Sequence, residues 1–214
     1  MPTLKDIQLK IAGVKKTKQI TKAMNMVATS RLRGAQANMD AFRPYAGKFG
    51  EVLGSLAEKA GEEASPLLVP SEEVKKIHIV LCTSDRGLCG GCNINLIDRA
   101  QALIDEKTAA GASFSITNFG KKGRDYCRKQ DFERVEEHLG VVGATFDFSV
   151  ASTAGKKLVD GFLEGDYDEV YVIFSEFLGM AKQDPVVQQL LPIPAIENDV
   201  DDLDADVPYQ AEHL

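Results

Sequence analysis

The sequence has no tryptophan, only four cysteines and no apolar run of about 20 residues, the length that a membrane-spanning helix requires. We therefore expect no direct membrane span. The N-terminal residues lack the apolar core of a signal peptide and the Arg- and Ser-rich character of a transit peptide, so we expect free thiols in a reducing compartment. What the sequence does contain is 214 residues, 44% of them hydrophobic, which suffices for one domain with an appendage.

Charge is divided unequally along the chain. Residues 1–48 contain ten Lys and Arg side chains and two Asp, a net charge of +8, and because the whole chain carries −7, the remaining residues carry −15. Residues 197–214 hold seven Asp and Glu and no Lys or Arg, which is typical of an acidic tail. The basic segment indicates a partner with an acidic surface: nucleic acid, lipid head groups or another protein.

The first 60 residues follow a helical pattern in which apolar side chains are spaced alternately three and four residues apart. Such a heptad seam is typical of a coiled coil, and a continuous helix of this length is about 85 Å long. We expect the seam to need a partner helix, because a rod cannot bury it alone. Its apolar members are Leu4, Ile7, Ile11, Val14, Ala28, Leu32, Ala35, Met39, Phe42, Ala46, Phe49, Leu53, Leu56 and Ala60.

The seam is interrupted in its middle, where Lys18, Thr21 and Asn25 occupy its positions. Basic side chains surround the interruption, and apolar ones lie on a neighbouring face of the helix. A run of charge is often only a solvated face, but the coincidence of charge, apolar patch and interruption favours docking or sliding against an acidic partner. The candidate contact residues are Lys15, Lys18, Lys22, Met24, Val27, Arg31 and Arg33.

Proline and glycine mark the end of this helical segment. Pro44 and the glycines after it predict a kink or a weakened helix beyond Arg43. Residues 61–74 contain two prolines and four glutamates without periodicity and are predicted to form a linker. The expected organisation is a coiled-coil helix at 1–60, the linker at 61–74, an α/β domain at 75–196 and the acidic tail at 197–214.

From Lys75 onward, predicted strands alternate with predicted helices. Strands are expected at 77–83, near 114–116, at 170–174 and, as an edge strand ended by Pro192, at 188–193; helices are expected at 94–104, after 120–123 and from 150 to near Gly165. This alternation predicts a Rossmann-like, mostly parallel α/β sheet. The fold class is therefore α/β with a long N-terminal coiled-coil helix.

The loop after the first predicted strand, Ser84–Asn93, lies where an α/β sheet commonly binds a ligand. It contains neither the Gly-x-Gly-x-x-Gly spacing nor a Walker A motif, so a tight turn explains it better than a phosphate site. Cys89 and Cys92 form a C-x-x-C motif, which leaves a redox protein of α/β fold as an alternative. We expect no metal site, because a structural zinc site requires four ligands.

The other motifs point to no chemistry. Gly120-Lys121-Lys122-Gly123 matches the GxxG turn of some RNA-binding domains, but a strand-to-helix turn also explains it. No Ser/His/Asp set or carboxylate pair stands out, so we expect no catalytic residue and no cofactor. Nucleic-acid binding, the third alternative, lacks a second basic patch and an aromatic platform.

Several longer motifs carry a resemblance to a known family. Residues 17–28, TKQITKAMNMVA, together with Arg31-Leu32-Arg33 and 43–46, RPYA, resemble the N-terminal helix of gamma subunits of the rotary ATP synthase. Residues 84–91, SDRGLCGG, followed by 93–96, NINL, resemble the central-domain signature of that family. Residues 120–123, 168–171 and 190–193 follow in the family's order, so the resemblance extends over nearly the whole chain.

The resemblance implies a mechanical role. Gamma subunits form the central stalk, in which N- and C-terminal helices pair as a coiled coil inside a head of alpha and beta subunits, while the α/β domain lies near the epsilon subunit and the c-ring. Catalysis takes place on the beta subunits, and the complex lies on the cytoplasmic face of the inner membrane. The basic collar would meet acidic levers of the beta subunits. The central signature adds candidate partner-binding residues: Asp85, Arg86, Gly87, Leu88, Cys89, Gly90, Gly91, Asn93 and Asn95.

The sequence departs from the family pattern at two places. Cys92 replaces a larger apolar residue that is usual in the family, which argues that the C-x-x-C arose by accident. The chain also ends in a tail that resembles the segment before the family's C-terminal helix. We expect a truncated form, and a rotor consisting only of these 214 residues should couple poorly.

Overall fold

A computed structural model describes residues 3–60, 65–141 and 148–194, with only the backbone described for 51 and 54–60. The chain divides into two compact units, Met1–Phe49 and Gly50–Leu214. The predicted acidic tail, 197–214, lies outside the described residues, as does the first part of the predicted linker, 61–64.

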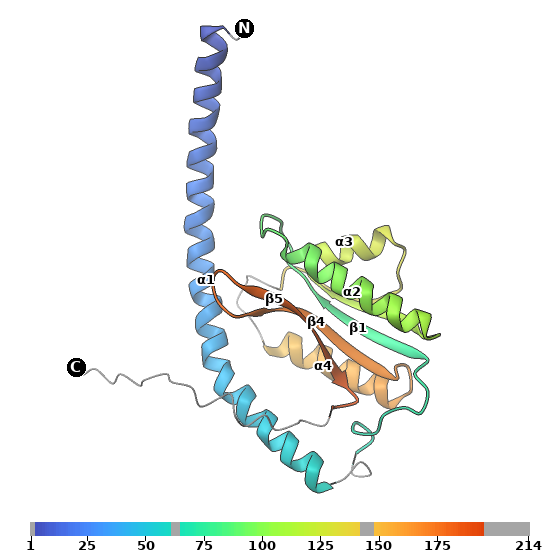
Figure 1. Cartoon of the computed structure of the whole chain (residues 1–214). Helices are drawn as coiled ribbons and strands as arrows, with labels where there is room; N and C mark the ends of the chain where they lie inside the picture. Colours follow the sequence, from blue (N-terminus) through green and yellow to red (C-terminus); the bar gives the residue numbers. More distant parts are fainter. Residues whose placement is uncertain (1–2, 61–64, 142–147, 195–214) are drawn as a thin grey trace, which may run out of the picture. The chain divides into compact units, whose positions relative to one another are not determined.

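Helix α1, Leu4–Ala60, confirms the predicted N-terminal helix (Figure 1). It begins with a capping box: the Thr3 N–H donates to Asp6 Oδ2 at 2.9 Å, and the Asp6 N–H donates back to Thr3 Oγ1 at 3.3 Å. The hydrogen bonds from Thr3 hold the pKa of the Asp6 carboxyl below its usual range. The helix is unbroken through Pro44, so the predicted weakening beyond Arg43 does not end it.

The second unit contains a five-stranded, mostly parallel sheet in the order β3-β2-β1-β4-β5, which confirms the predicted α/β fold. Neighbouring strands run parallel except β4 and β5, which are antiparallel. Helices α2 and α3 cover one face and α4 the other (Figure 1). The strands are β1 Lys76–Cys82, β2 Ser113–Phe119, β3 Arg134–His138, β4 Glu169–Phe177 and β5 Gln183–Leu191; the helices are α2 Cys92–Ala109, α3 Lys121–Lys129 and α4 Phe148–Leu163.

Two edge strands differ from the prediction. β3 was not predicted, because its sequence RVEEH has a single strongly apolar residue. β5 begins at Gln183 rather than at 188, since an edge strand tolerates a proline and Pro185 lies within it. None of the described helices has both the length and the apolar character needed to cross a membrane.

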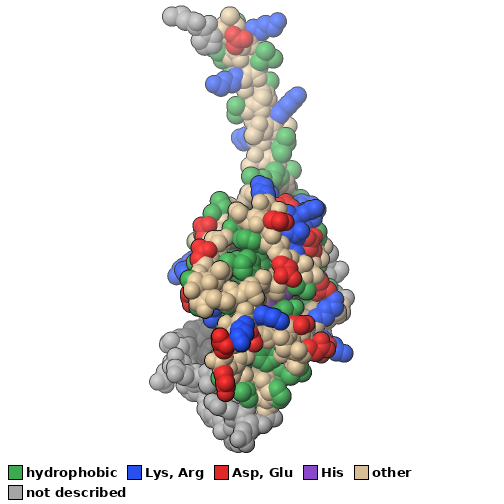
Figure 2. All heavy atoms as spheres, turned by 90° about the vertical axis from the view of Figure 1, so that its right-hand side faces the viewer, with side chains coloured by type: hydrophobic (Ala, Val, Ile, Leu, Met, Phe, Trp, Pro, Cys, Tyr) green, Lys and Arg blue, Asp and Glu red, His purple; other side chains and the backbone are tan. Residues whose placement is uncertain are grey.

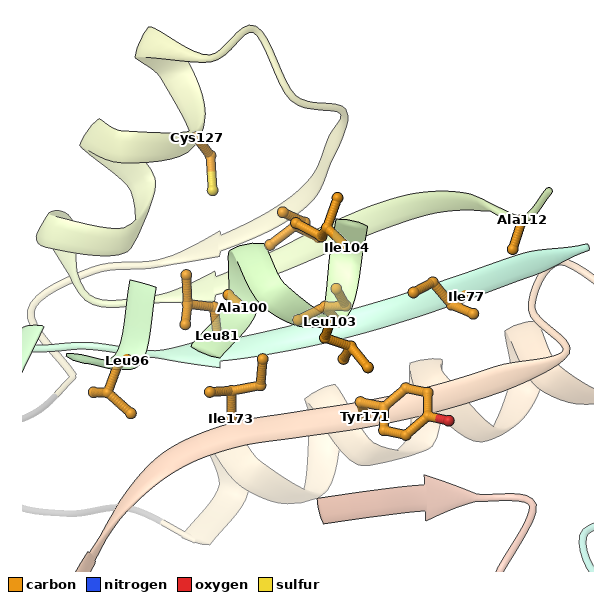
Figure 3. Packing of buried hydrophobic residues seen from close by; sticks show 12 residues of the cluster. Ile77, Leu81, Leu96, Ala100, Leu103, Ile104, Ala112, Cys127, Tyr171 and Ile173 are labelled. Atoms are coloured by element: carbon orange, nitrogen blue, oxygen red, sulfur yellow. The ribbon is translucent and has the colours of Figure 1, made fainter. Parts of the chain in front are cut away.

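The main core lies between the sheet and α2 (Figure 3). Side chains on one face of the central strands meet the inward face of α2, whose apolar positions recur at helical spacing. The cluster includes Ile77, Ile79 and Leu81 of β1, Tyr171 and Ile173 of β4, and Leu96, Ala100, Leu103 and Ile104 of α2. This packing places the loop between β1 and α2 on a rigid base.

The opposite face of the sheet contains a fully buried histidine. His78 lies between two hydroxyls of β2, with its Nδ1 2.7 Å from Ser115 Oγ and its Nε2 2.9 Å from Thr117 Oγ1. The Tyr167 ring lies against the imidazole at 4.4 Å between centroids. Burial disfavours the charged imidazolium and lowers the pKa of His78 to about 4.

We expect His78 to make the stability of this domain pH-dependent. The unfolded chain, with an ordinary histidine pKa near 6.5, binds a proton that the folded domain excludes until about pH 4. The contribution of neutral His78 to the free energy of unfolding is therefore complete above pH 6.5 and is lost as the pH falls towards 4. Between about pH 7.5 and pH 5 the loss amounts to about 2 kcal/mol. Urea titrations followed by tyrosine fluorescence measure this loss. A His78→Gln variant should lose less stability over the same interval; an equal loss would contradict the assignment.

The segment before β1 is attached to the domain through Asp168. Its Oδ2 accepts the N–H groups of Lys75 and Lys76, each at 2.8 Å, and Ser71 Oγ donates to Oδ1 at 3.4 Å. Leu67 packs against the cluster on the α4 face, and its carbonyl accepts the Ile193 N–H at 2.8 Å. The described part of the predicted linker, from residue 65, therefore contacts the sheet domain.

Candidate functional site

The apolar seam of α1 is exposed along the part of the helix nearest its N-terminus. Leu4, Ile7, Ile11 and Val14 are all exposed, and Val14 keeps 62% of its surface accessible. Figure 2 shows hydrophobic side chains along this rod between projecting Lys and Arg side chains. A stripe of this length is unusual on a monomeric surface and indicates a binding face.

The threonines in and beside the interrupted part of the seam have their hydroxyl donors bonded within the helix. The hydroxyl of Thr17 donates to the Gly13 carbonyl at 3.1 Å, that of Thr21 to the Thr17 carbonyl at 2.8 Å, and that of Thr29 to the Asn25 carbonyl at 2.9 Å. Each hydroxyl is thus bonded within its own helix. A partner on this face would meet threonine hydroxyls whose hydrogens are already used inside the helix.

All predicted contact residues of α1 are exposed. Met24 and Val27 keep about half of their surface accessible, and together with Met26 they give the polar stretch an apolar neighbour. No ion pair is formed among the described groups by the basic side chains around them, which are Lys15, Lys18, Lys22, Arg31 and Arg33. Their charges are available to an external partner.

The loop between β1 and α2 is held from inside by Asn93. This side chain is only 9% exposed; its Oδ1 accepts the Ser84 N–H at 3.0 Å, and its Nδ2 donates to Ser84 Oγ at 2.9 Å and to Cys89 Sγ at 3.0 Å. Asn93 therefore positions the loop, whereas Asn95 is exposed beside it on α2.

Asp85 connects the same loop to neighbouring segments. Its Oδ1 accepts the Lys121 N–H at the start of α3 at 3.1 Å, and its Oδ2 accepts the Gly140 N–H at 3.1 Å. A carboxylate at this place also suits the positive end of the α3 dipole. The predicted contact residue thus fixes three segments at the carboxyl edge of the sheet.

The tip of the loop projects into solvent. Arg86 is exposed and forms no ion pair with the described residues, and Leu88 has 89% of its surface accessible. Leu88 adopts a φ of +66°, and Gly90 one of +59°, a region that non-glycine residues rarely occupy. An exposed leucine held in this conformation between Gly87 and Cys89 is a second candidate contact.

The GxxG segment is explained by packing. Gly120 has a φ of +92°, and a Cβ there would lie 2.1 Å from the Thr83 carbonyl oxygen. A Cβ on Gly123 would lie 2.9 Å from Asn118 Oδ1, and its N–H donates to Thr83 Oγ1 at 2.8 Å. Both glycines allow β1, β2 and α3 to approach closely.

Two features near the loop were not predicted from the sequence. Thr83 is buried and joins β1 to Gly123 and to the Phe119 carbonyl, which no local motif indicates. Lys121 and Lys122 are exposed on α3, and the Lys122 side chain reaches within 4.0 Å of where a Cβ on Gly87 would lie. Within the described ranges, no three His, Cys, Asp or Glu side chains are grouped as metal ligands would be.

Comparison with known sequences identifies close relatives. A family model described as ATP synthase matches residues 3–213. The ATP synthase gamma chain of Desulfosudis oleivorans is 66% identical over 216 residues, covering 100% of this chain and 72% of the relative. The gamma chain of Geobacter sp. strain M21 is 41% identical over 210 residues, covering 98% and 72%. These relatives give no support to the alternative that the chain is a redox protein of α/β fold.

Solved structures show the same fold. A chain in the central stalk and c-ring structure of the Tetrahymena thermophila mitochondrial ATP synthase matches with a TM-score of 0.62 at 23% identity, covering 81% of this chain and 72% of that one. A chain of the Euglena gracilis mitochondrial ATP synthase rotor matches with a TM-score of 0.55 at 18% identity, covering 86% and 61%. At these identities the likeness concerns the fold.

Proposed function

The chain belongs to the ATP synthase gamma-chain family, and on this basis we propose how its surfaces serve a central-stalk rotor. As a gamma chain it is a non-catalytic subunit that couples proton flow to conformational changes at catalytic subunits. The observation that supports this role most directly is the exposed seam of α1, because a helix of 57 residues with an uncovered apolar stripe is built to pack inside a larger assembly.

The interrupted seam is proposed as the sliding contact with the head. Its threonines are bonded within the helix, so rotation past a partner breaks few hydrogen bonds. The surrounding collar of Lys15, Lys18, Lys22, Arg31 and Arg33 attracts acidic levers of the beta subunits without deep interdigitation. Electrostatic attraction together with a smooth polar surface suits a bearing.

The β1–α2 loop is proposed as a second partner-binding surface. Asn93 and Asp85 hold it from inside, while Arg86 and Leu88 offer charge and apolar surface to a neighbouring subunit. The proposed partners are the alpha and beta subunits of the head, the epsilon subunit and the c-ring. The assembly would then place this chain at the cytoplasmic face of the inner membrane as a peripheral subunit.

Affinity purification of the tagged chain from its native host tests these partners. We expect alpha, beta and epsilon subunits in stoichiometric amounts, identified by intact mass together with the mass of the bait. Recovery of the chain alone would contradict the rotor assignment.

Reversing charge in the collar should weaken binding to the head. In the Arg31→Glu/Arg33→Glu double variant, attraction becomes repulsion at two exposed sites, each worth up to about 1 kcal/mol. We expect about a tenfold loss of affinity for a purified alpha–beta head, which corresponds to about 1.4 kcal/mol. Titration at low and at high ionic strength measures the effect, which salt should reduce.

The matched control is Lys5→Glu/Lys10→Glu, which changes the net charge equally outside the collar. Equal losses in both double variants would show that overall charge, not the collar, determines binding. A loss unaffected by salt would also contradict an electrostatic contact.

A further inference from the structure

Cys89 and Cys92 are the two ends of a single hydrogen-bonded turn. The Cys92 N–H donates to the Cys89 carbonyl at 3.3 Å, and the two residues between them are Gly90, with a φ of +59°, and Gly91. The ends of such a turn lie less than about 7 Å apart between Cα atoms. Disulfides join residues whose Cα atoms are about 4.4 to 6.8 Å apart, so the backbone already brings these cysteines into the required range.

The other two cysteines have thiols that are harder to deprotonate. Cys127 is buried in the main core, and burial raises the pKa of its thiol. Cys82 keeps some exposed surface, but burial raises the pKa of its thiol to about 11. Cys89, in contrast, is exposed, and Cys92 is partly exposed at the start of α2. The pair that shares the turn therefore contains the one fully exposed thiol of the described chain.

The surrounding hydrogen bonds allow the Cys89 sulfur to move. It accepts from Asn93 Nδ2 at 3.0 Å, and the same amide group donates to Ser84 Oγ at 2.9 Å. If the sulfur turned towards Cys92, the Asn93 amide would lose one of these two hydrogen bonds but keep the one to Ser84 Oγ. The two glycines between the cysteines place no side chain between the sulfur atoms, and the space beside Gly90 is open: a Cβ there would meet no atom within 4 Å.

We propose that Cys89 and Cys92 form a thiol–disulfide exchange site on the surface of this subunit. The oxidant is a disulfide of low molecular weight, such as oxidised glutathione. The Cys89 thiolate attacks one of its sulfurs and releases one glutathione thiol, and the Cys92 thiolate then attacks the Cys89 sulfur and releases the second. The two cysteines lose two protons and two electrons in total, and glutathione disulfide is reduced to two thiols.

This site differs from the redox enzyme considered from the sequence. The pair has no substrate and no turnover; it is a place where the chain itself is reversibly modified. Cys92 departs from the family pattern, but the turn gives the two cysteines the backbone geometry that a local disulfide needs.

Peptide mapping of the full chain tests the proposal. The folded chain is equilibrated in buffers with different ratios of reduced to oxidised glutathione, quenched with acid, alkylated with N-ethylmaleimide after denaturation and digested with trypsin. Trypsin separates Cys82, in residues 77–86, and Cys127, in 125–128, from the pair, which shares residues 87–99. We expect the doubly alkylated 87–99 peptide to be replaced, as the buffer becomes oxidising, by an unalkylated peptide two hydrogen atoms lighter than the free dithiol form, and to reappear on reduction.

Variants distinguish the two steps. Cys92→Ser should retain glutathione on Cys89, because the resolving thiol is missing. Cys89→Ser should abolish the intramolecular disulfide, and this substitution is at the exposed member of the pair. Cys82→Ser, the matched control, should leave the transition unchanged. Complete alkylation of both cysteines at every ratio, or a persistent glutathione adduct on the unmodified pair, would overturn the proposal.

Discussion

Replacing Ile11 and Val14 by aspartate is expected to abolish proton-driven ATP synthesis by an assembled complex in which a partner helix covers the seam. Both residues lie on the seam of α1 and are exposed in the isolated chain, so they would be buried only against a partner helix. Each substitution loses about 1.5 to 3 kcal/mol of apolar burial and also places a carboxylate in the seam. A combined loss of about 5 kcal/mol corresponds to a factor of roughly four thousand in association.

Membrane vesicles energised by a proton gradient provide the measurement, and Leu9→Asp provides the matched control. Leu9 is equally apolar and exposed on α1, but it lies on the side of the helix opposite the seam. We expect Leu9→Asp to retain much more coupled synthesis than the seam variant. Comparable losses would mean that the seam has no special role in assembly.

The second large effect is expected at Gly120 in the α/β domain. Its backbone, with φ +92° and ψ 151°, occupies a region used almost only by glycine, and an added Cβ would lie 2.1 Å from the Thr83 carbonyl oxygen. Strain of about 1–3 kcal/mol and overpacking of about 1–3 kcal/mol add to a destabilisation of about 4 kcal/mol for Gly120→Ala. Urea unfolding followed by tyrosine fluorescence measures the change.

Gly111→Ala isolates the contribution of backbone strain. Gly111 has a similar φ of +94°, but a Cβ there would meet no atom within 4 Å. Its substitution should therefore cost only the strain, and the difference between the two variants reports the close approach of β1 to the turn before α3. A Gly120→Ala variant no less stable than Gly111→Ala would contradict this packing.

Elements with strong periodicity were predictable from the sequence. The seam identified α1 over its full length, and the buried strands β1 and β4 appear as continuous apolar runs. β3 has no such signal: Arg134, Glu136 and His138 are only partly buried at an edge, so apolar burial does not specify the strand. Its place follows from parallel pairing with β2, a long-range contact that local pattern does not encode.

The candidate site was predictable as a set of segments, but not in the role of each residue. The exposure of the proposed collar on α1 was predictable, since the spacing of side chains on one helix determines which of them share a face. In the loop, spacing could not separate the exposed residues from those that hold the loop. Asn93 bonds to Ser84, nine residues earlier, and Asp85 bonds to Gly140, 55 residues later. These contacts depend on the folded sheet.

The most direct test of the rotor assignment is single-molecule observation of the native complex. The complex is isolated from its host and immobilised through its head, and a light-scattering particle is attached to the α/β domain of this chain. On addition of ATP we expect sustained rotation of the particle in one direction, stopped by an inhibitor of hydrolysis. A particle that stays fixed relative to the head while the complex hydrolyses ATP would contradict the account.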